Sequence, residues 1–126
     1  MLLGAFVLSA GYYGKYYLKA QKVRTMIKAQ LDEAFKKVDY LISPTMPILP
    51  FKIGEKIDDP LKLYLTDINT VTANLSGIPA ISVPFSMSRS GLPIGIQLFA
   101  NSFKEKELLQ AAHALQETSI LPEMPL

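Results

Sequence analysis

Residues 80–99 read AISVPFSMSRSGLPIGIQLF, and this stretch decides the fold class. Its first part, Ala80–Phe85, is apolar and β-branched, which is typical of a strand. A polar turn over Met87–Gly91 follows. Pro93–Phe99 then alternates enough to form the returning strand, although Gly95 offers no side chain for packing. The stretch therefore predicts two strands joined by a turn.

The segment after this hairpin has the pattern of an amphipathic helix. Ser102 and Glu105 have the spacing of a capping box, which predicts a helix over residues 103–117. Leu108, Ala112 and Leu115 fall on one face of that helix. We expect this face to pack on the sheet.

The segments before the hairpin supply more helices and one more strand. Short helices are predicted over Leu61–Leu65 and Ile68–Ser76, the second ended by Gly77. Helical spacing of apolar residues predicts a long helix over Lys15–Val38, and Asp39–Ser43 reads as a buried strand before a proline-rich loop. The fold class is therefore α/β, and residues 1–126 show no internal domain boundary. Three strands are few for a self-contained α/β sheet.

Composition excludes several classes of protein. The chain has 126 residues, 49% of them hydrophobic, and a net charge of +2, which is too small to indicate a nucleic-acid binder. The absence of Cys excludes a disulfide scaffold and a thiol nucleophile, and a single His makes a histidine metal cage remote. We expect no metal site in this chain.

The first ten residues, MLLGAFVLSA, are apolar. This run is too short for a transmembrane helix, which needs about 20 residues. A signal peptide is the nearer alternative, but no Lys or Arg precedes the run. We expect a buried helix here and no membrane partner.

The polar residues offer few convincing catalytic groups. Ser82 and the serines of the turn lie outside any Gly-x-Ser-x-Gly elbow, and His113 is expected on the surface, where Glu117 can pair with it. Asp67 is the most interesting acid. It could cap the following helix with its carboxylate, or it could bind an ammonium group in a region flanked by Gly and Pro.

Several strings of residues resemble one family over nearly the whole chain, in order and without large gaps. They are Leu3-Gly4, Leu8-Ser9-Ala10-Gly11-Tyr12-Tyr13, Lys22-Val23-Arg24-Thr25, Ser43-Pro44-Thr45-Met46-Pro47, residues 51–56, residues 58–61, residues 64–68, residues 74–84 and residues 91–98. The chain resembles the C-terminal part of the A subunits of glutamyl-tRNA(Gln)/aspartyl-tRNA(Asn) amidotransferases, within the amidase-signature family. The resemblance implies part of a mixed sheet flanked by helices, incomplete on its own.

The resemblance also implies a function in translation. In this family the A subunit is the glutaminase, which releases ammonia from glutamine. The B subunit uses ATP and Mg to activate Glu-tRNA(Gln), which ammonia converts to Gln-tRNA(Gln), and the C subunit braces the other two. The implied partners are therefore the B and C subunits, glutamine and, indirectly, tRNA. The implied location is the cytoplasm or an organelle.

The chain departs from the family in one respect. It contains no Gly-Gly-Ser-Ser-Gly-Gly-Ser segment and no matching upstream Lys, so the Ser-Ser-Lys triad of the family is absent from these residues. Without a nucleophile and an oxyanion hole, amide hydrolysis lacks its main sources of barrier lowering. We therefore expect no catalytic residue here and no activity of this chain alone. If the glutaminase is split into two chains, we expect its N-terminal segment as a further partner.

One functional residue follows from the resemblance. Asp67, in Leu65-Thr66-Asp67-Ile68, matches the acid that holds the α-amino group of substrate glutamine in this family. Arg24 and Arg89 do not match the arginine that binds the substrate carboxylate. Two alternatives stay open: a non-catalytic scaffold that docks through its amphipathic helix, and part of another amide hydrolase of the amidase family. The sequence does not distinguish the Gln pathway from the Asn pathway.

Overall fold

The structure is a computed structural model that describes residues 8, 11–54 and 60–119. The expected apolar helix over residues 1–10 lies outside the described residues apart from Leu8. The elements, in chain order, are a π-helical turn η1 (Tyr13–Tyr17), α2 (Leu18–Ala34), β1 (Tyr40–Pro44), α3 (Pro60–Thr66), α4 (Val71–Ser76), β2 (Ala80–Met87), β3 (Pro93–Ala100) and α5 (Glu105–Thr118).

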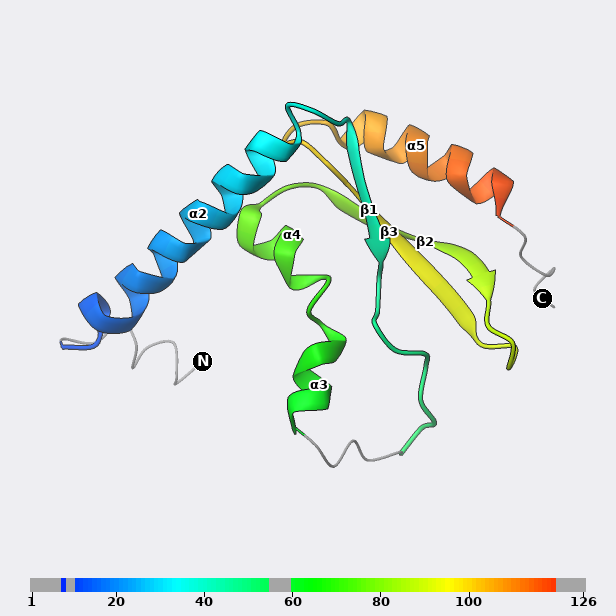
Figure 1. Ribbon diagram of the computed structural model, residues 1–126, viewed down its shortest axis with the longest axis horizontal. Helices are drawn as coiled ribbons and strands as arrows, with labels where there is room; N and C mark the ends of the chain where they lie inside the picture. Colours follow the sequence, from blue (N-terminus) through cyan, green and yellow to red (C-terminus); the bar gives the residue numbers. More distant parts are fainter. Residues whose placement is uncertain (1–7, 9–10, 55–59, 120–126) are drawn as a thin grey trace.

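The three strands form one antiparallel sheet in the order β1-β3-β2 (Figure 1). The expected hairpin is β2 and β3, and its turn is closed by a hydrogen bond of 2.7 Å from the Ser88 N–H to the Leu92 oxygen. The register shifts between Pro84 and Ser86, because a proline cannot donate to the ladder. The α/β class is confirmed, and β3 is the central strand.

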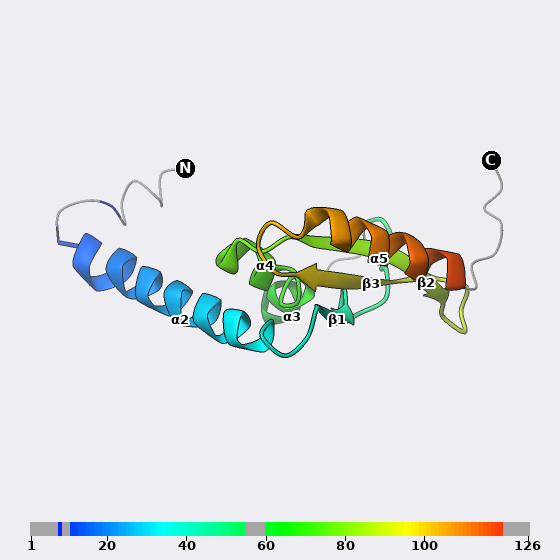
Figure 2. The same ribbon diagram turned by 90° about the horizontal axis from the view of Figure 1, so that it is seen from above.

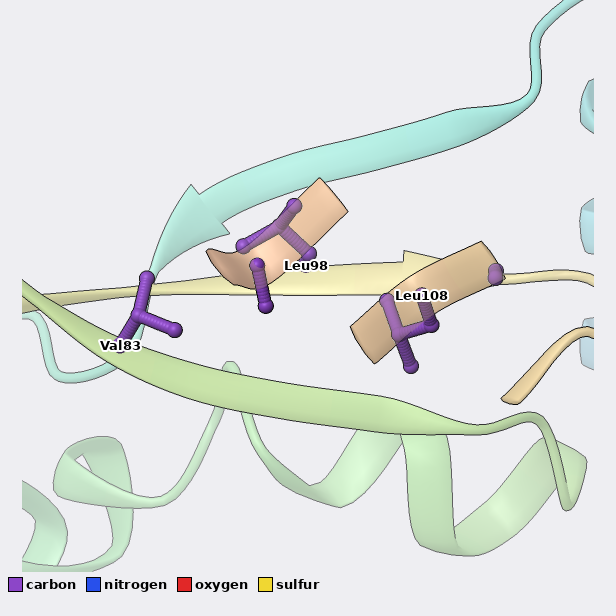
Figure 3. Close-up of a cluster of buried hydrophobic side chains, with 5 residues drawn as sticks. Val83, Leu98 and Leu108 are labelled. Carbon is purple, nitrogen blue, oxygen red and sulfur yellow. The ribbon is translucent and has the colours of Figure 1, made fainter. Parts of the chain in front are cut away.

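Helix α5 covers one face of β2 and β3 (Figure 2). The expected inner face is confirmed, since Leu108 and Ala112 are each 3% exposed and belong to a buried cluster with Val83, Leu98 and Ala100 of the sheet. Leu115 is partly buried and packs against this cluster. Figure 3 shows Leu108 beside Val83 and Leu98 of the sheet. Successive strand residues point to opposite faces, so the residues next to Leu98 in β3 face away from α5.

The start of α5 differs from the prediction. The capping box of Ser102 and Glu105 is wrong, because the N-cap position is Lys104 and no side chain caps the helix. Instead, Phe103 adopts a positive φ of 65°, and the Asn101 carboxamide oxygen accepts the Ser102 N–H at 2.8 Å. The chain therefore enters α5 through a tight turn, which the spacing of Ser and Glu did not indicate.

Helix α2 packs against α4 and extends beyond the sheet (Figures 1 and 2). The Arg24 Nε donates a hydrogen bond of 2.7 Å to the Leu75 oxygen in the last turn of α4. Gly77 ends α4 in the left-handed conformation, as predicted, and its N–H bonds the Ala73 oxygen. The long helix was expected to reach Val38, but α2 ends at Ala34.

The described residues bury only a small core, and large apolar side chains on α2 and α3 stay exposed. Met26 on α2 is 63% exposed, and Leu61 and Tyr64 on α3 are 65% and 79% exposed. These helices thus present apolar surface that no other described element covers. Within the described ranges, no helix is both long enough and apolar enough to cross a bilayer.

Candidate functional site

Asp67 lies in the turn between α3 and α4, on the surface of the molecule. Its main-chain oxygen accepts the N–H groups of Thr70 at 3.0 Å and Val71 at 3.1 Å, and it also accepts the Thr70 hydroxyl at 3.0 Å. The N-cap position of α4 is Thr70, not Asp67. The capping alternative for the Asp67 carboxylate is therefore wrong: the backbone oxygen, and not the side chain, holds the start of this helix.

The carboxylate of Asp67 is free within the part of the chain that the structure describes. None of the hydrogen bonds or ion pairs found among those residues uses its oxygens. A surface carboxylate without a partner is available to a cationic group of a ligand or of another polypeptide. The backbone alone determines where this group is presented.

The turn that carries Asp67 is fixed to the sheet two residues further on, at Asn69. The Asn69 side-chain amide donates to the Pro44 oxygen at 3.0 Å, and the main-chain oxygen of Asn69 accepts a hydrogen bond of 3.0 Å from the Gln97 side chain. Pro44 ends β1 and Gln97 lies in β3. The α3–α4 turn is therefore bound to two neighbouring strands.

Gln97 is the buried centre of a polar row across the sheet. Its register partners are Ser43 on β1 and Ser82 on β2, so the three side chains share the face opposite α5. The Gln97 amide is 4% exposed and also donates to the Ser43 hydroxyl at 3.0 Å and the Pro44 oxygen at 3.4 Å. Burying an amide in an apolar strand is tolerated because these acceptors satisfy it.

The Ser82 hydroxyl continues this row to the proline-rich loop. It lies 2.7 Å from the Thr45 hydroxyl, and the Thr45 N–H bonds the Gly95 oxygen at 3.1 Å. A Cβ on Gly95 would lie 3.3 Å from both hydroxyl oxygens, so a larger residue would press on the pair. Gly95, expected to be a weak point of the strand, is where the two hydroxyls approach the backbone closely.

Two open hollows adjoin the row on either side of the Thr45–Ser82 pair. One, of about 410 Å³, lies under the proline-rich loop between Thr45 and Phe51. The other, of about 560 Å³, is lined by Thr45, Thr70, Asn74, Gln97 and neighbouring residues. Asp67 lines neither hollow, and its side chain is exposed among the described residues.

The other candidates remain apart from this site. His113 is on the surface beside Glu117, with 3.5 Å between Nε2 and Oε1. Arg24 bonds α4 and Arg89 is exposed in the hairpin turn, so neither joins Asp67 in a hydrogen bond found here. In the ranges 11–54 and 60–119, three or more His, Cys, Asp or Glu side chains nowhere gather as metal ligands would.

Two pKa values depart from their ordinary range, both in an exposed ion pair of α5. The hydrogen bond between Lys104 and Glu107, 2.8 Å long, raises the pKa of the Lys104 ammonium and lowers the pKa of the Glu107 carboxyl. The pair joins two residues at the start of α5 and makes no ion pair with Asp67. It does not mark a catalytic group.

Gln97, Asn69 and Ser43 were not predicted as site residues. One signal was available: Gln97 is a lone amide within the apolar run Ile94–Phe99, and a buried amide requires hydrogen-bond partners. Its partner Asn69 is 28 residues away in the sequence. The pattern could therefore indicate that Gln97 has a partner, but not which residue that partner is.

Known proteins resemble this chain over nearly its full length. The profile of the amidase family matches residues 1–109. The A subunit of the glutamyl-tRNA(Gln) amidotransferase of Koribacter versatilis is 58% identical over 116 residues, which are 92% of this chain and 24% of that protein. The corresponding protein of Methanosarcina mazei is 55% identical over 119 residues, which are 94% of this chain and 25% of that protein.

A solved structure shows the same arrangement in space. The crystal structure of the A subunit of glutamyl-tRNA(Gln) amidotransferase from Thermotoga maritima superimposes with a TM-score of 0.82 and 45% identity, over 97% of this chain and 26% of that one. The chain thus spans about a quarter of the length of the relatives it matches. The resemblance to the C-terminal part of these A subunits is confirmed. Because the family profile covers most of its residues, this chain belongs to the amidase family.

Proposed function

We propose that this chain is the C-terminal part of the glutaminase subunit of a tRNA-dependent amidotransferase. The observation that carries the proposal is the identity of 58% to the A subunit of a glutamyl-tRNA(Gln) amidotransferase over 92% of this chain. The glutaminase would hydrolyse glutamine and supply ammonia for the conversion of Glu-tRNA(Gln) to Gln-tRNA(Gln). This activity belongs to the assembled enzyme, of which this chain would supply one part.

In this proposal, Asp67 binds the α-ammonium group of glutamine. Its carboxylate is unpaired among the described residues, and the turn that carries it is held by the hydrogen bonds of Asn69. An exposed ion pair contributes only about 0.2–1 kcal/mol, so Asp67 on an open surface would bind an amine weakly. Other residues of the glutaminase must therefore close over the carboxylate for it to select glutamine.

The nucleophile and the oxyanion hole would come from the rest of the glutaminase. The amidase Gly/Ser-rich segment is absent from these residues, so this chain alone should not hydrolyse an amide. The exposed apolar side chains of α2 and α3 support this division, because they present the kind of surface that further polypeptide covers. Without such a layer, the chain should associate with itself or with a partner.

The partners and cofactors follow from the same proposal. The glutaminase would assemble with B and C subunits, and the B subunit would use ATP and Mg to activate the tRNA-bound substrate. Contact of this chain with tRNA would be indirect, because its net charge of +2 is small. The reaction would take place in the cytoplasm or in an organelle, where the tRNA is charged.

The decisive experiment compares glutamine hydrolysis by this chain alone with hydrolysis by the assembled enzyme. We expect no turnover by the chain alone, and turnover once it is co-expressed with the remainder of the glutaminase and with the B and C subunits. In that enzyme, Asp67→Ala should raise the glutamine KM by about tenfold or more, since an ion pair to a desolvated charge contributes a few kcal/mol. The matched control is Asp39→Ala, at an exposed acid outside the α3–α4 turn.

Three results would contradict the proposal in different ways. Turnover by the chain alone would show that it contains its own nucleophile. An unchanged KM in Asp67→Ala would remove Asp67 from the site. A complex that forms normally but hydrolyses a different amide would indicate another amide hydrolase. A complex that hydrolyses no amide would indicate the scaffold, an alternative that the exposed apolar surface of α2 also supports.

A further inference from the structure

The starting observation is a buried amide that bonds a surface turn. Gln97 is 4% exposed, yet its Nε2 lies within hydrogen-bond distance of three oxygens: the Ser43 hydroxyl, the Pro44 oxygen and the Asn69 oxygen. The first two belong to β1, which is already paired with β3 through its backbone. Only the third bond reaches outside the sheet, so it is the one that places another element.

The turn from Asp67 to Val71 is rigid within itself. The main-chain oxygen of Asp67 accepts two backbone N–H groups and a hydroxyl, which closes the turn onto α4. A turn with closed internal hydrogen bonds moves as a unit. Bonds from its N–H groups to the Tyr64 and Leu65 oxygens join it to α3. Its orientation on the sheet depends on the bonds from Gln97 to the Asn69 oxygen and from the Asn69 amide to Pro44.

The carboxylate of Asp67 cannot supply this orientation itself. It has no partner among the described residues that could hold it in one place. A charged group that selects a ligand by geometry must be held within a fraction of an ångström by its support, or the bond to the ligand weakens. The residue of the turn that bonds to the sheet is Asn69, and the side chain that holds the Asn69 backbone is Gln97.

We propose that Gln97 is a positioning residue that acts through the Asn69 backbone to present the Asp67 carboxylate to the amino group of the substrate. This inference rests on the proposed function, since it requires Asp67 to bind an ammonium. It adds that Gln97, a buried residue of β3, contributes to the preference for a substrate with an α-ammonium group. Gln97 itself touches neither substrate nor nucleophile.

The test compares glutamine with glutaramate, which has the same side-chain amide and carboxylate but lacks the amino group. In the assembled enzyme, Gln97→Met keeps the length of the side chain and removes its hydrogen bonds. We expect the glutamine KM to rise about threefold to tenfold, which is the change that the loss of a single hydrogen bond produces. The kcat should stay within about twofold of that of the unmodified enzyme. The inhibition constant of glutaramate against glutamine hydrolysis should stay within about twofold, because its binding does not use Asp67.

A second measurement asks whether Gln97 acts through Asp67. In an Asp67→Asn background, Gln97→Met should add no further rise in the glutamine KM, since the contact that it orients is already lost. The matched control is Gln110→Met, at an exposed glutamine of α5, and it should change neither constant. If Gln97→Met does not fold, Asn69→Ala removes the other side-chain bond between the turn and the sheet and should give the same pattern.

The outcomes separate this inference from the proposed function. If Asp67→Asn alone leaves the glutamine KM unchanged, the proposed role of Asp67 is wrong and this inference falls with it. If Asp67→Asn raises that KM but Gln97→Met does not, only the positioning role is overturned. The positioning role is also overturned if the inhibition constant of glutaramate rises as much as the glutamine KM. It is overturned as well if the KM rises add in the double variant, because both results indicate a general effect on the fold.

Discussion

The side chain of Gln97 donates a hydrogen bond of 3.0 Å to the main-chain oxygen of Asn69, across 28 residues of sequence. The bond joins the centre of the sheet to the turn that carries Asp67. Gln97 is buried, whereas Asp67 in the turn is exposed. The effect of this bond on the flexibility of the turn can therefore be measured without an activity assay.

Loss of this bond should loosen the α3–α4 turn. In Gln97→Met, the Asn69 oxygen loses the Gln97 donor, whereas the Pro44 oxygen keeps the Asn69 side-chain amide. Loss of one such hydrogen bond costs about 0.5–1.5 kcal/mol. Peptides that cover residues 68–71 should therefore exchange their amide hydrogens faster than in the unmodified protein, as measured by mass spectrometry. Gln110→Met should leave that exchange unchanged. Equal exchange in both variants would show that the turn does not depend on Gln97.

The packing of α5 on the sheet should depend on one face of the helix. Leu108 is 3% exposed and its neighbour Leu109 is 59% exposed, so the two positions offer a matched pair. Leu108→Ala should lower the free energy of unfolding by about 2–5 kcal/mol, because it leaves a cavity in the core. Leu109→Ala should change it by no more than about 0.5 kcal/mol. Urea denaturation followed by circular dichroism measures both, and similar losses would contradict the observed face.

Two glycines should respond to alanine with opposite signs. Gly77 ends α4 with a φ of 72°, where an added Cβ meets no atom within 4 Å. Gly77→Ala should therefore destabilise by about 1–2 kcal/mol through backbone strain alone. Gly14 lies in a helical turn with no positive φ and equally open space, so Gly14→Ala should be neutral or stabilising by up to about 1 kcal/mol. Thermal unfolding gives the sign, and destabilisation by both would refute the role of φ.

The ion pair of Lys104 and Glu107 should make stability depend weakly on pH. The pKa of Glu107 is lowered, so its contribution is present above the ordinary value of 4.5 and is lost as pH falls through the folded pKa. The pKa of Lys104 is raised, so its contribution is present below the ordinary value of 10.5 and is lost as pH rises through the folded pKa. Both effects are small because the two side chains are exposed.

Glu107→Gln isolates this contribution. The unmodified chain should exceed the variant in stability between pH values of about 5 and 10, and the difference should vanish in acid. Salt near 1 M should reduce it, since screening weakens exposed pairs. Unfolding curves across pH at two salt concentrations measure the difference. A difference that persists in acid would show that the pair is not its source.

Local patterns predicted much of the fold. The hairpin of β2 and β3, the helix over α2, the buried face of α5 and the end of α4 at Gly77 all depend on neighbours within a few residues. Where a prediction was wrong, a local competitor prevailed: the left-handed turn at Phe103 replaced the expected capping box at the start of α5. The sequence singled out Asp67 among the acids, and the family resemblance then gave it a role in binding glutamine.

By itself, the sequence determined the class of the elements, the family and the candidate acid, because these depend on residue identity and on spacing along the chain. The tertiary structure alone decided that β1 pairs with β3, that the Asp67 carboxylate caps no helix, and that Gln97 holds the turn beside it. The strand pairing and the bond of Gln97 join residues tens of positions apart. A buried amide accepts any suitably placed oxygen, and only the folded chain brings the oxygen of Asn69 within its reach.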